Sequence, residues 1–490
     1  MAAAEIEPSF LRQHAVGFGN SVVVHSEVEG EASHGGQRVA HRKYAVYQQC
    51  PNGIRDLPIG RYRGGEIDAN DDRVFHCMLS VDNRQCRREM SIASTTTRGW
   101  KDSFMVMRVR VVAPIAAILF ACSTIAAPQQ QYAESSRDLQ GVVNEMRSTQ
   151  RLPGLAVVVV RSDGQPRVYV SGERRIGKGD PITPADRMHL GSLTKALTAT
   201  VIGALTEQHR MTLDTTIGET FPELSVKMQP AYRVVNVRQL LAHSGGVPPY
   251  RTRASLQGML ALKGTATEQR HEFLERVLAE PPRFEAGTRH EYSNAGGAIA
   301  GAIAERIGGA PYRQLVQELV FAPLGGQAWF GNPGLAVTPQ PWGHARTIFG
   351  TVAEVSPADA VYTTPLAIEP AGDVSLSPRD YGRFLQLHLR GLRGRDDVLK
   401  ATTIQDLHRK APPINPSLGF AMGWSVMPRD GVESHEHVGS YGAFVAYATI
   451  QESRDLAVGA FANLGGGQDL RDAVANVALQ ITTRISTEKK

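Results

Sequence analysis

A hydroxyl and an amine stand three residues apart in the run Gly191-Ser192-Leu193-Thr194-Lys195. Apolar residues recur at helical spacing from Ala196 to Leu205, so this run is predicted to open a long helix. Ser192 and Lys195 would then lie on one face, at the positive end of that helix. Free backbone N–H groups there can stabilise a developing oxyanion, and burial lowers the pKa of an amine. A neutral amine beside a hydroxyl is the arrangement of an activated nucleophile.

The Ser-x-x-Lys spacing is weak evidence by itself. It also occurs at Ser486-Thr487-Glu488-Lys489, in a polar tail that no helix follows. The alternative interpretation of Ser192 is an ordinary helix N-cap with a solvated lysine nearby. Partners from elsewhere in the chain must therefore decide between the two.

Tyr292-Ser293-Asn294 supplies a phenol and an amide just before a Gly/Ala-rich segment of helical period, residues 296–307. Of the 13 tyrosines, only Tyr292 has an asparagine two positions later. A phenol beside an ammonium group ionises more easily and can pass protons, and an asparagine offers both a donor and an acceptor to a substrate amide. The alternative is a turn with an asparagine cap.

His437-Val438-Gly439-Ser440 is expected at the entry to a strand over residues 443–449. A glycine on an edge strand lets a ligand approach the backbone closely, and a cationic or hydrogen-bonding His437 could hold a substrate carboxylate. The alternative is a surface histidine before a strand.

Composition excludes several classes of protein. The 490 residues are 42% hydrophobic and 21% charged, which is typical of a globular protein, and the net charge of +5 comes from scattered residues. This pattern does not predict a nucleic-acid surface. No cysteine follows Cys122, so the main body has no disulfide framework, cysteine nucleophile or thiolate metal site. The three earlier cysteines form no Cys-x-x-Cys pair, which argues against zinc there.

The first part of the chain is expected to lie outside the folded body. Residues 1–104 lack sustained periodicity and are predicted to be disordered or to precede the true start. Residues 105–127 combine the basic run Met107-Arg108-Val109-Arg110, an apolar run and small residues before Pro128, which predicts a secretory signal peptide rather than a buried core segment. Its internal position suggests translation from Met105 or Met107.

Two locations follow from this segment. Cleavage after the small residues predicts a periplasmic or secreted protein. Leu119-Phe120-Ala121-Cys122 also resembles a bacterial lipobox, so the alternative is a protein attached to the bacterial envelope membrane through a lipidated Cys122.

Strong patterning from Ser135 onward predicts an α+β fold, with an antiparallel sheet flanked by helices and a helical subdomain inserted between its strands. A loop-rich stretch over 323–371 precedes the last part. Helices are expected at 136–150, 196–210, 272–278, 296–307, 380–388 and 469–485, and strands at 155–161, 167–171, 422–426, 443–451 and 456–463.

In their order along the chain, Ser192-x-x-Lys195, Tyr292-x-Asn294 and His437-Val438-Gly439 resemble the three motifs of the serine β-lactamase and penicillin-binding-protein superfamily. The resemblance is to the branch of class C β-lactamases, D-alanyl-D-alanine carboxypeptidases and esterases. It runs from about Ser135 to the C-terminus and includes the flanks Leu240-Leu241-Ala242-His243-Ser244-Gly245-Gly246, Phe284-Glu285-Ala286-Gly287 and Phe321-Ala322-Pro323-Leu324-Gly325. It implies a β-lactamase/transpeptidase-like hydrolase domain over residues 130–490.

The resemblance also implies roles for the matching residues. Ser192 would be the acylated nucleophile, and Lys195 and Tyr292 would share the proton transfers, with the identity of the base left open. Asn294 would hold the substrate's amide side chain, and His437 would take the electrostatic place of the family's lysine. The N–H groups of Ser192 and Ser440, the latter next to Gly439, would form the oxyanion hole. No metal or organic cofactor is implied.

Two positions depart from the β-lactamase pattern. His437 and Val438 stand where the family has Lys-Thr, which weakens recognition of a carboxylate. Histidine at this point is familiar among carboxypeptidase and esterase relatives. Trp342 to His344 and Asp373 look like features of a periplasmic-hydrolase subgroup, or else serve loop packing.

The sequence therefore predicts a secreted serine hydrolase that works through an acyl-enzyme on an amide or ester bond. The substrate would be a small molecule or peptide: a β-lactam, a D-Ala-D-Ala peptide or a small ester. The alternative is a penicillin-binding or sensing protein that is acylated without efficient turnover.

Overall fold

The computed structural model describes residues 22–28, 33–34, 37–38, 42–50, 53–56 and 130–487, except 348, 360–362 and 413–417. The chain divides into two compact units, Met1–Ala127 and Pro128–Lys490. The expected signal segment over 105–127, with Cys122, lies outside the described residues. Within the described part of the chain, no helix is both long enough and apolar enough to cross a membrane.

The first unit contains short antiparallel strands where the sequence predicts no regular structure. They are β1 (Val22–Val28), β2 (Ser33–His34), β3 (Gln37–Arg38), β4 (Arg42–Cys50) and β5 (Gly53–Asp56). One sheet has the order β1-β4-β5, and β2 pairs with β3. These strands are not predicted from the sequence, because short β-branched and aromatic runs can pair as hairpins without a sustained period. That residues 1–104 are disordered or precede the true start stays a prediction. The remainder of 1–104 lies outside the described residues.

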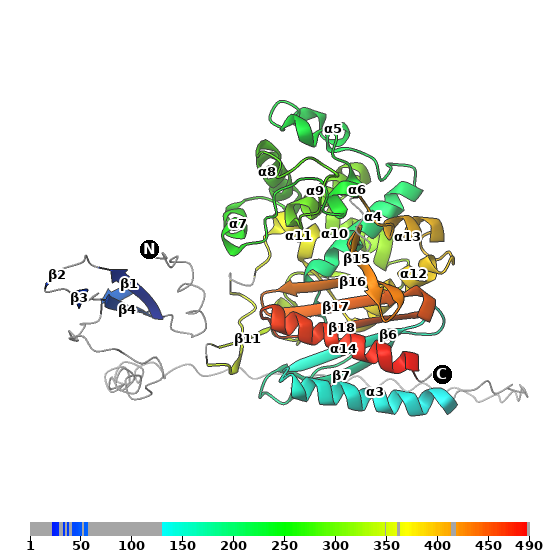
Figure 1. Ribbon diagram of the computed structural model, residues 1–490, viewed down its shortest axis with the longest axis horizontal. Helices are drawn as coiled ribbons and strands as arrows, with labels where there is room; N and C mark the ends of the chain where they lie inside the picture. Colours follow the sequence, from blue (N-terminus) through cyan, green and yellow to red (C-terminus); the bar gives the residue numbers. More distant parts are fainter. Residues whose placement is uncertain are drawn as a thin grey trace, which may run out of the picture. The chain divides into compact units, whose positions relative to one another are not determined.

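The second unit is built on an eight-stranded antiparallel sheet with the order β14-β15-β16-β17-β18-β6-β7-β8 (Figure 1). Its strands are β6 (Gly154–Val160), β7 (Arg167–Arg175), β8 (Asp180–Pro181), β14 (Gly419–Ala421), β15 (Trp424–Arg429), β16 (Val432–Tyr441), β17 (Phe444–Gln451) and β18 (Leu456–Ala462). β6 pairs with β18, with Leu155 opposite Ala462, so the two ends of the unit meet in one sheet. The predicted hairpin of β6 and β7 is confirmed.

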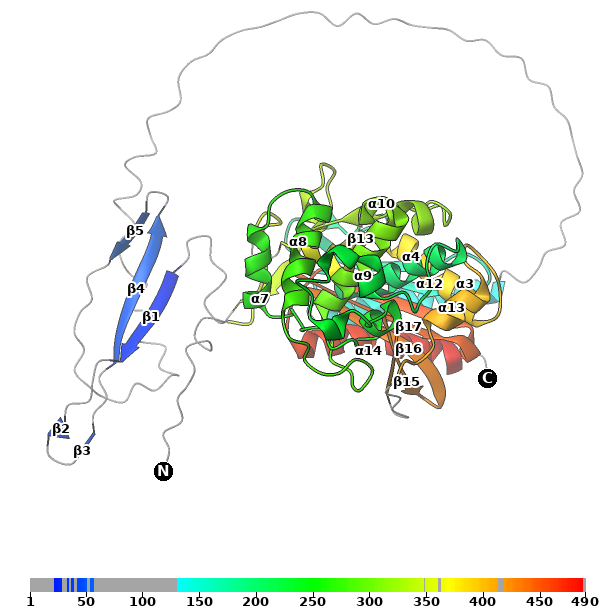
Figure 2. The ribbon, with the colours of Figure 1, turned by 90° about the horizontal axis from the view of Figure 1, so that it is seen from above.

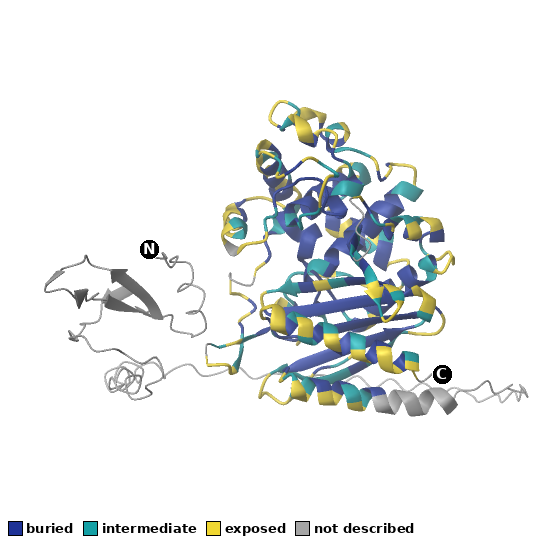
Figure 3. Cartoon of the chain, in the orientation of Figure 1, coloured by how far each residue is buried: buried dark blue, intermediate teal, exposed yellow. Residues whose placement is uncertain are grey.

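Both faces of this sheet are covered, and its central strands are buried (Figure 3). Side chains alternate between the two faces of a strand. In β6, Leu155, Val157 and Val159 join a core with the helices α3 (Gln130–Thr149) and α14 (Gln468–Thr487). The alternate residues of β6 join the larger core on the opposite face. The α+β fold with flanking helices is therefore confirmed.

The larger core is filled by the helical region between β8 and β14 (Figures 1 and 2). Its helices are α4 (Thr194–Glu207), α5 (Ile217–Thr220), α6 (Val237–Leu241), α7 (Arg253–Gln257), α8 (Ala266–Ala279), α9 (Asn294–Gly308), α10 (Tyr312–Val316), α11 (Glu369–Gly372), α12 (Pro378–Leu392) and α13 (Ala401–Leu407). Short strands accompany them: β9 (Met188–His189), β10 (Trp329–Phe330), β11 (His344–Arg346), β12 (Val352–Glu354) and β13 (Val374–Leu376).

Local sequence explains the ends of the two longest helices in this region. α9 begins after Ser293, whose side chain accepts a hydrogen bond from the Gly296 N–H, and ends at Gly309 with φ of 65°. α12 begins after Ser377, with Pro378 at its first position. These are preferred N-cap and C-cap signals, and the predicted helices at both places are confirmed.

β16 corrects one sequence expectation. The motif His437-Val438-Gly439-Ser440 lies inside a separate strand rather than at the entry to the next one, and Gly439 pairs with Ala446 of β17. The sequence does not indicate this strand, because polar residues interrupt the alternation of its apolar residues. Two of them are nevertheless buried: His435 hydrogen-bonds with His408, and Glu436 forms an ion pair with Arg429.

Candidate active site

Ser192 lies in η1 (Gly191–Leu193), a single 3₁₀ turn directly before α4. The residue at the N-cap position of α4 is Leu193, and no side chain caps the helix, which excludes the N-cap interpretation of Ser192. Gly191 has φ of 52°, a left-handed conformation that favours glycine. A Cβ atom on Gly191 would lie 2.7 Å from the Ser440 nitrogen, so glycine also lets β16 approach this turn.

Lys195 is buried one turn further along α4, with 1% of its surface exposed. Its Nζ lies 3.3 Å from Ser192 Oγ, 2.9 Å from Asn294 Oδ1 and 2.7 Å from the Ala371 carbonyl oxygen. Burial lowers the pKa of Lys195 to about 7. About half of the lysines are therefore neutral at neutral pH.

The three partners match the hydrogen-bonding capacity of a neutral amine. A neutral Nζ has two N–H donors and one lone pair. Asn294 Oδ1 and the Ala371 carbonyl can only accept, so they take the two N–H groups. In the charged form the third N–H donates to Ser192 Oγ. In the neutral form the lone pair takes its place and can accept the Ser192 proton, which is the geometry of a base and its nucleophile.

Tyr292 comes from the loop before α9, and its hydroxyl donates to Ser192 Oγ at 2.5 Å. Its ring centroid lies 4.6 Å from Lys195 Nζ. Burial nevertheless raises the pKa of Tyr292 to about 12, so the phenol keeps its proton at neutral pH. This corrects the expectation of an easily ionised phenol: the cost of burying a phenolate outweighs the hydrogen bond with Ser192 and the attraction of Arg471 and Arg251, which lower the pKa.

Asn294 is the first residue of α9, and its amide is largely engaged by the protein. Its Oδ1 accepts from Lys195, and its Nδ2 donates to the Tyr250 carbonyl at 3.0 Å. One Nδ2 hydrogen stays available for a ligand. Asn294 thus orients the lysine and also faces the cavity described below.

His437 differs from the expected cation. Its ring lies with Nδ1 2.5 Å from the Gly423 carbonyl oxygen, which can only accept, so Nδ1 carries the hydrogen. Burial lowers the pKa of His437 to about 4. The imidazole is therefore neutral at neutral pH, and its Nε2 is an acceptor rather than the positive charge predicted for a substrate carboxylate.

Gly439 and Ser440 place the backbone of β16 against the nucleophile turn. A Cβ atom on Gly439 would lie 1.9 Å from the Leu190 carbonyl oxygen, so a larger residue would force the strand away. Ser192 and Ser440 both line one cavity, and their backbone N–H groups are the candidate oxyanion donors.

This cavity has a volume of about 430 Å³, and Ser192 is one of its lining residues. Arg251 and Arg471 line it, and no aspartate or glutamate is found among its described lining residues. Among the described residues, none hydrogen-bonds with the buried Arg471 Nε. The cavity is therefore suited to a compact ligand with an anionic group.

No sequence pattern predicts the His189–Asp373 pair, which supports the nucleophile turn. The Gly191 N–H donates to His189 Nδ1 at 3.1 Å, so the ring hydrogen is on Nε2, which faces Asp373 Oδ1 at 3.3 Å. Both side chains are buried. Asp373 therefore orients the ring that holds Gly191. Asp373 was noted from the sequence, but nothing there linked it to His189, 184 residues away.

A second residue without a sequence-based role is His243, which packs against Tyr292 with ring centroids 4.5 Å apart. Its Nδ1 accepts from the Ser293 N–H at 3.3 Å, and burial holds its pKa well below the usual value. The loop His243-Ser244-Gly245-Gly246 was the available signal. By contrast, His344 is buried against the Asn463 carbonyl and Trp342 stacks under Arg175, so this subgroup feature serves packing.

No cluster of three or more His, Cys, Asp or Glu residues suited to a metal ion is found among the described residues.

The chain was compared with known proteins. The family model described as "Beta-lactamase" matches residues 139–482. The chain is 25% identical over 316 residues to a protein named "Beta-lactamase" from Escherichia coli K12, covering 64% of this chain and 76% of that protein. It is 24% identical over 316 residues to "Penicillin-binding protein 4" from Amycolatopsis lactamdurans, covering 62% and 79%.

Among solved structures, the D-amino acid amidase from Ochrobactrum anthropi SV3 shares the fold, with a TM-score of 0.59 and 20% identity over 73% of this chain and 100% of that one. The similarities support a β-lactamase-fold serine hydrolase or a penicillin-binding-protein-like protein. Because the family model spans most of the chain, the protein belongs to the beta-lactamase family.

Proposed function

We propose that this protein is a serine hydrolase that cleaves amide or ester bonds of compact anionic substrates through an acyl-enzyme on Ser192. The observation that carries the proposal is one convergence: the Ser192 hydroxyl lies within 3.3 Å of the Lys195 amine and 2.5 Å of the Tyr292 hydroxyl. These groups come from separate motifs a hundred residues apart and meet beside one cavity.

Acylation begins with Lys195 neutral. The amine takes the proton of the Ser192 hydroxyl while Oγ forms a bond to the substrate carbonyl carbon. The carbonyl oxygen becomes an oxyanion held by the N–H groups of Ser192 and Ser440, each worth about 3 kcal/mol. The carbon–nitrogen or carbon–oxygen bond then breaks, and its electron pair stays on the leaving group. Tyr292 gives that group a proton and regains one from the Lys195 ammonium.

Hydrolysis repeats these steps with water as the nucleophile. Neutral Lys195 accepts a proton from water, whose oxygen attacks the acyl carbon. The second tetrahedral intermediate collapses by breaking its bond to Ser192 Oγ, which takes the proton back. Lys195 is the better candidate for the base because its pKa is about 7, whereas that of Tyr292 is about 12.

Substrate preference follows from the charges at the site. Arg251 and Arg471 supply positive charge on the cavity lining, which favours an anionic group there. The neutral His437 lies outside this lining, on the same strand as Ser440, and offers an acceptor rather than a charge to a carboxylate. The cavity of about 430 Å³ suits a β-lactam, a short peptide terminus or a small ester.

The test is turnover by wild type and Ser192→Ala of three probes: nitrocefin, a D-Ala-D-Ala peptide and a p-nitrophenyl ester. Wild type should hydrolyse at least one, and Ser192→Ala should lose that activity by 10³-fold or more. Ser486→Ala, in the second Ser-x-x-Lys sequence, is the matched control and should behave as wild type. Activity retained in Ser192→Ala would refute the site.

The similarity to a penicillin-binding protein supports a second candidate, acylation without turnover. Mass spectrometry distinguishes the two after mixing with a β-lactam. A hydrolase shows a transient adduct and continuing product formation, whereas a binding protein shows one equivalent of stable adduct on Ser192 and no further product.

We also propose export of the chain, supported by the basic, apolar and small-residue pattern of residues 105–127. The mature N-terminus would follow Ala126 or Ala127, or would be a lipidated Cys122. Mass spectrometry of the N-terminal peptide from the native host distinguishes these, and an intact segment 105–127 would refute export.

A further inference from the structure

An ion-pair cluster, buried except for the exposed Arg313, lies outside the lining of the substrate cavity. It consists of Arg270 of α8, Glu305 of α9, Arg313 of α10 and Glu369 of α11, and it is called the arginine cluster below. Arg270 and Glu305 meet in a bidentate pair, with Nε to Oε2 at 3.0 Å and Nη2 to Oε1 at 2.9 Å. Their side chains are 1% and 6% exposed.

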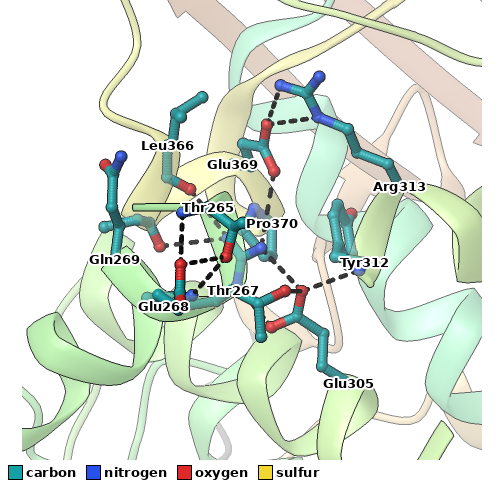
Figure 4. Close-up of polar contacts among 12 residues, drawn as sticks. Thr265, Thr267, Glu268, Gln269, Glu305, Tyr312, Arg313, Leu366, Glu369 and Pro370 are labelled. Carbon is teal, nitrogen blue, oxygen red and sulfur yellow. Dashed lines mark hydrogen bonds and ion pairs between the residues drawn. The ribbon is translucent and has the colours of Figure 1, made fainter. Parts of the chain in front are cut away.

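Arg270 also holds the chain segment that ends in α11. Its Nη1 donates to the Leu366 carbonyl at 2.9 Å, and its Nη2 lies 3.6 Å from Glu369 Oε2. Arg313 donates to the other oxygen of Glu369 from the opposite side, with Nε to Oε1 at 2.7 Å (Figure 4). The segment Leu366–Gly372 is therefore fixed at a backbone carbonyl and at a fully buried carboxylate.

That segment carries one acceptor of the lysine amine. The Ala371 carbonyl, two residues after Glu369, accepts from Lys195 at 2.7 Å. The neighbouring Pro370 carbonyl accepts from Thr198, one turn after Lys195 on α4, at 2.6 Å.

The second acceptor of the lysine amine lies at the start of α9, and Arg270 binds a residue near the end of the same helix. Asn294 opens α9, and Glu305 lies near the end of the same helix. Glu305 Oε1 also accepts from the Tyr312 N–H at 2.8 Å, and the Tyr312 hydroxyl hydrogen-bonds with Thr198 (Figure 4). Arg270 thus links the carriers of both acceptors, α9 and Leu366–Gly372, which also pack directly on each other where Gly301 meets Pro370.

We propose that Arg270 is a positioning residue for Lys195: by joining α9 to Leu366–Gly372 it fixes both acceptors of the amine, so that the lone pair faces Ser192. The inference rests on the proposed acyl-enzyme chemistry at Ser192. It assigns a role in the reaction to a guanidinium that touches neither the substrate cavity nor the reacting atoms.

The free-energy cost of burying charges indicates that the arginine cluster fixes the positions of its partners rather than adding net stability to the fold. Two charges taken out of water lose several kcal/mol of hydration, and apolar side chains of similar volume often stabilise a core as well. What apolar residues lack is the fixed fork of donors that a guanidinium offers to carbonyl and carboxylate oxygens. A cavity of about 490 Å³ also borders Arg270, Glu305 and Glu369, so one side of the cluster has no side chains packed on it.

The groups that face Lys195 define what a pH measurement would report. They are the hydroxyls of Ser192 and Tyr292, with the rings of His243 and His437 within electrostatic range. Both rings have pKa values lowered by burial, so they stay neutral where Lys195 titrates. The pH at which activity appears is therefore a readout of the lysine and its surroundings.

The experiment compares the pH dependence of kcat/KM in wild type, Arg270→Met and Glu305→Gln. If the cluster positions the acceptors, either change loosens them, admits water to Lys195 and moves its pKa toward the ordinary value. Both variants should then shift the acid limb upward by about one pH unit and lower kcat/KM at pH 7 by about fivefold. KM should change little, because substrate contacts are intact.

An electrostatic effect through space predicts a different pattern. Loss of the Arg270 cation would raise the midpoint, and loss of the Glu305 anion would lower it. The proposal is overturned if the acid limbs of Arg270→Met and Glu305→Gln shift in opposite directions, or if the folded variants keep the wild-type limb. Arg270→Lys keeps the charge but not the fork, and should recover only part of the wild-type profile.

Two controls separate positioning from general stability and from the chemistry. Arg390→Met removes an arginine of α12 that pairs with Asp397 at 2.7 Å, and should lower the melting temperature without moving the limb. Glu369→Gln is the substitute if Arg270→Met fails to fold, with the same upward shift expected. Ser192→Ala tests the underlying chemistry. If Ser192→Ala stays active, the proposed function fails. If Ser192→Ala is inactive but the acid limbs of Arg270→Met and Glu305→Gln do not move, only the role of Arg270 is refuted.

Discussion

Lys195 carries the reaction chemistry at the scale of a single residue because burial and hydrogen bonding act on it together. Burial lowers the pKa to about 7, and two carbonyl oxygens fix the orientation of the amine. Ser192 Oγ accepts from Tyr292 and lies 3.3 Å from the amine. The charged amine donates its third N–H to Ser192 Oγ, whereas the neutral amine has a lone pair there that can take the serine proton.

Activity should therefore rise with pH through the titration of Lys195. The amine is charged below its pKa and cannot accept the serine proton, so kcat/KM should increase tenfold per pH unit below about 7 and level off above it. A pH profile from 5 to 9 with any turned-over substrate measures this.

Lys195→Arg is the informative variant, because a guanidinium stays protonated across this range. It should lose activity at every pH rather than shift the profile. A wild-type profile that stays level from pH 5 to 9 would contradict the assignment and point to His437, whose pKa is about 4.

At the scale of elements, the site depends on how closely β16 approaches η1. Gly439 touches the Leu190 carbonyl so closely that a Cβ atom would lie 1.9 Å from it. On the other side, the His189–Asp373 pair connects β9 to the start of β13 and holds the Gly191 N–H. The nucleophile turn η1 is thus packed between β16 and the buried His189–Asp373 pair.

Gly439→Ala should push β16 away from η1 and displace the Ser440 N–H from the oxyanion position. We expect kcat to fall by about 10² to 10³, the usual loss for one oxyanion donor, with a lowered melting temperature. Gly141→Ala is the matched control: nothing lies within 4 Å of its added Cβ, and in α3 it should stabilise the fold by about 0.5–1 kcal/mol. Normal kcat in Gly439→Ala would contradict this account of β16.

At the scale of the whole molecule, a chain of three buried histidines joins the helical region to the sheet. His388 of α12 hydrogen-bonds with His408 at 2.8 Å, and His408 with His435 of β16 at 3.0 Å. Thr200 of α4 contacts the far side of His388 at 3.0 Å. Burial lowers all three histidine pKa values, that of His388 to about 3 and that of His435 to about 4.

This chain should make the fold sensitive to acid. The unfolded histidines titrate near 6.5 and the folded ones lower, so the unfolded state binds more protons in between. Stability is full above pH 6.5 and falls as the pH drops to about 4, by about 1.4 kcal/mol per pH unit for each histidine.

Urea denaturation between pH 4 and 7 measures this slope. His408→Met should flatten it, because fewer neutral histidines remain to be protonated on unfolding. His271→Gln replaces a histidine that is 39% exposed and should leave the slope as in wild type. An equal slope in wild type and His408→Met would refute the buried chain as its source.

Much of the fold could be predicted because its signals are local. The apolar period after Ala196, the Gly/Ala run before Ile307 and the caps at Ser377 and Gly309 each act within a few residues, and each marks a helix of the structure. β16 was not predicted as a strand because its buried His435 and Glu436 are satisfied by partners from α13 and β15. Local polarity cannot show such partners.

The residues that could do chemistry can be read from the chain without a structure: Ser192 with Lys195, Tyr292 with Asn294, and the motif at His437. Their types and spacing are covalent facts, and helix periodicity places the first pair on one face. Their protonation states depend on the folded environment. The neutral lysine, the protonated phenol and the neutral His437 all follow from burial, and burial is a property of what surrounds a side chain in space. The joining of α9 to Leu366–Gly372 through Arg270 is likewise a meeting of distant segments that no local pattern encodes.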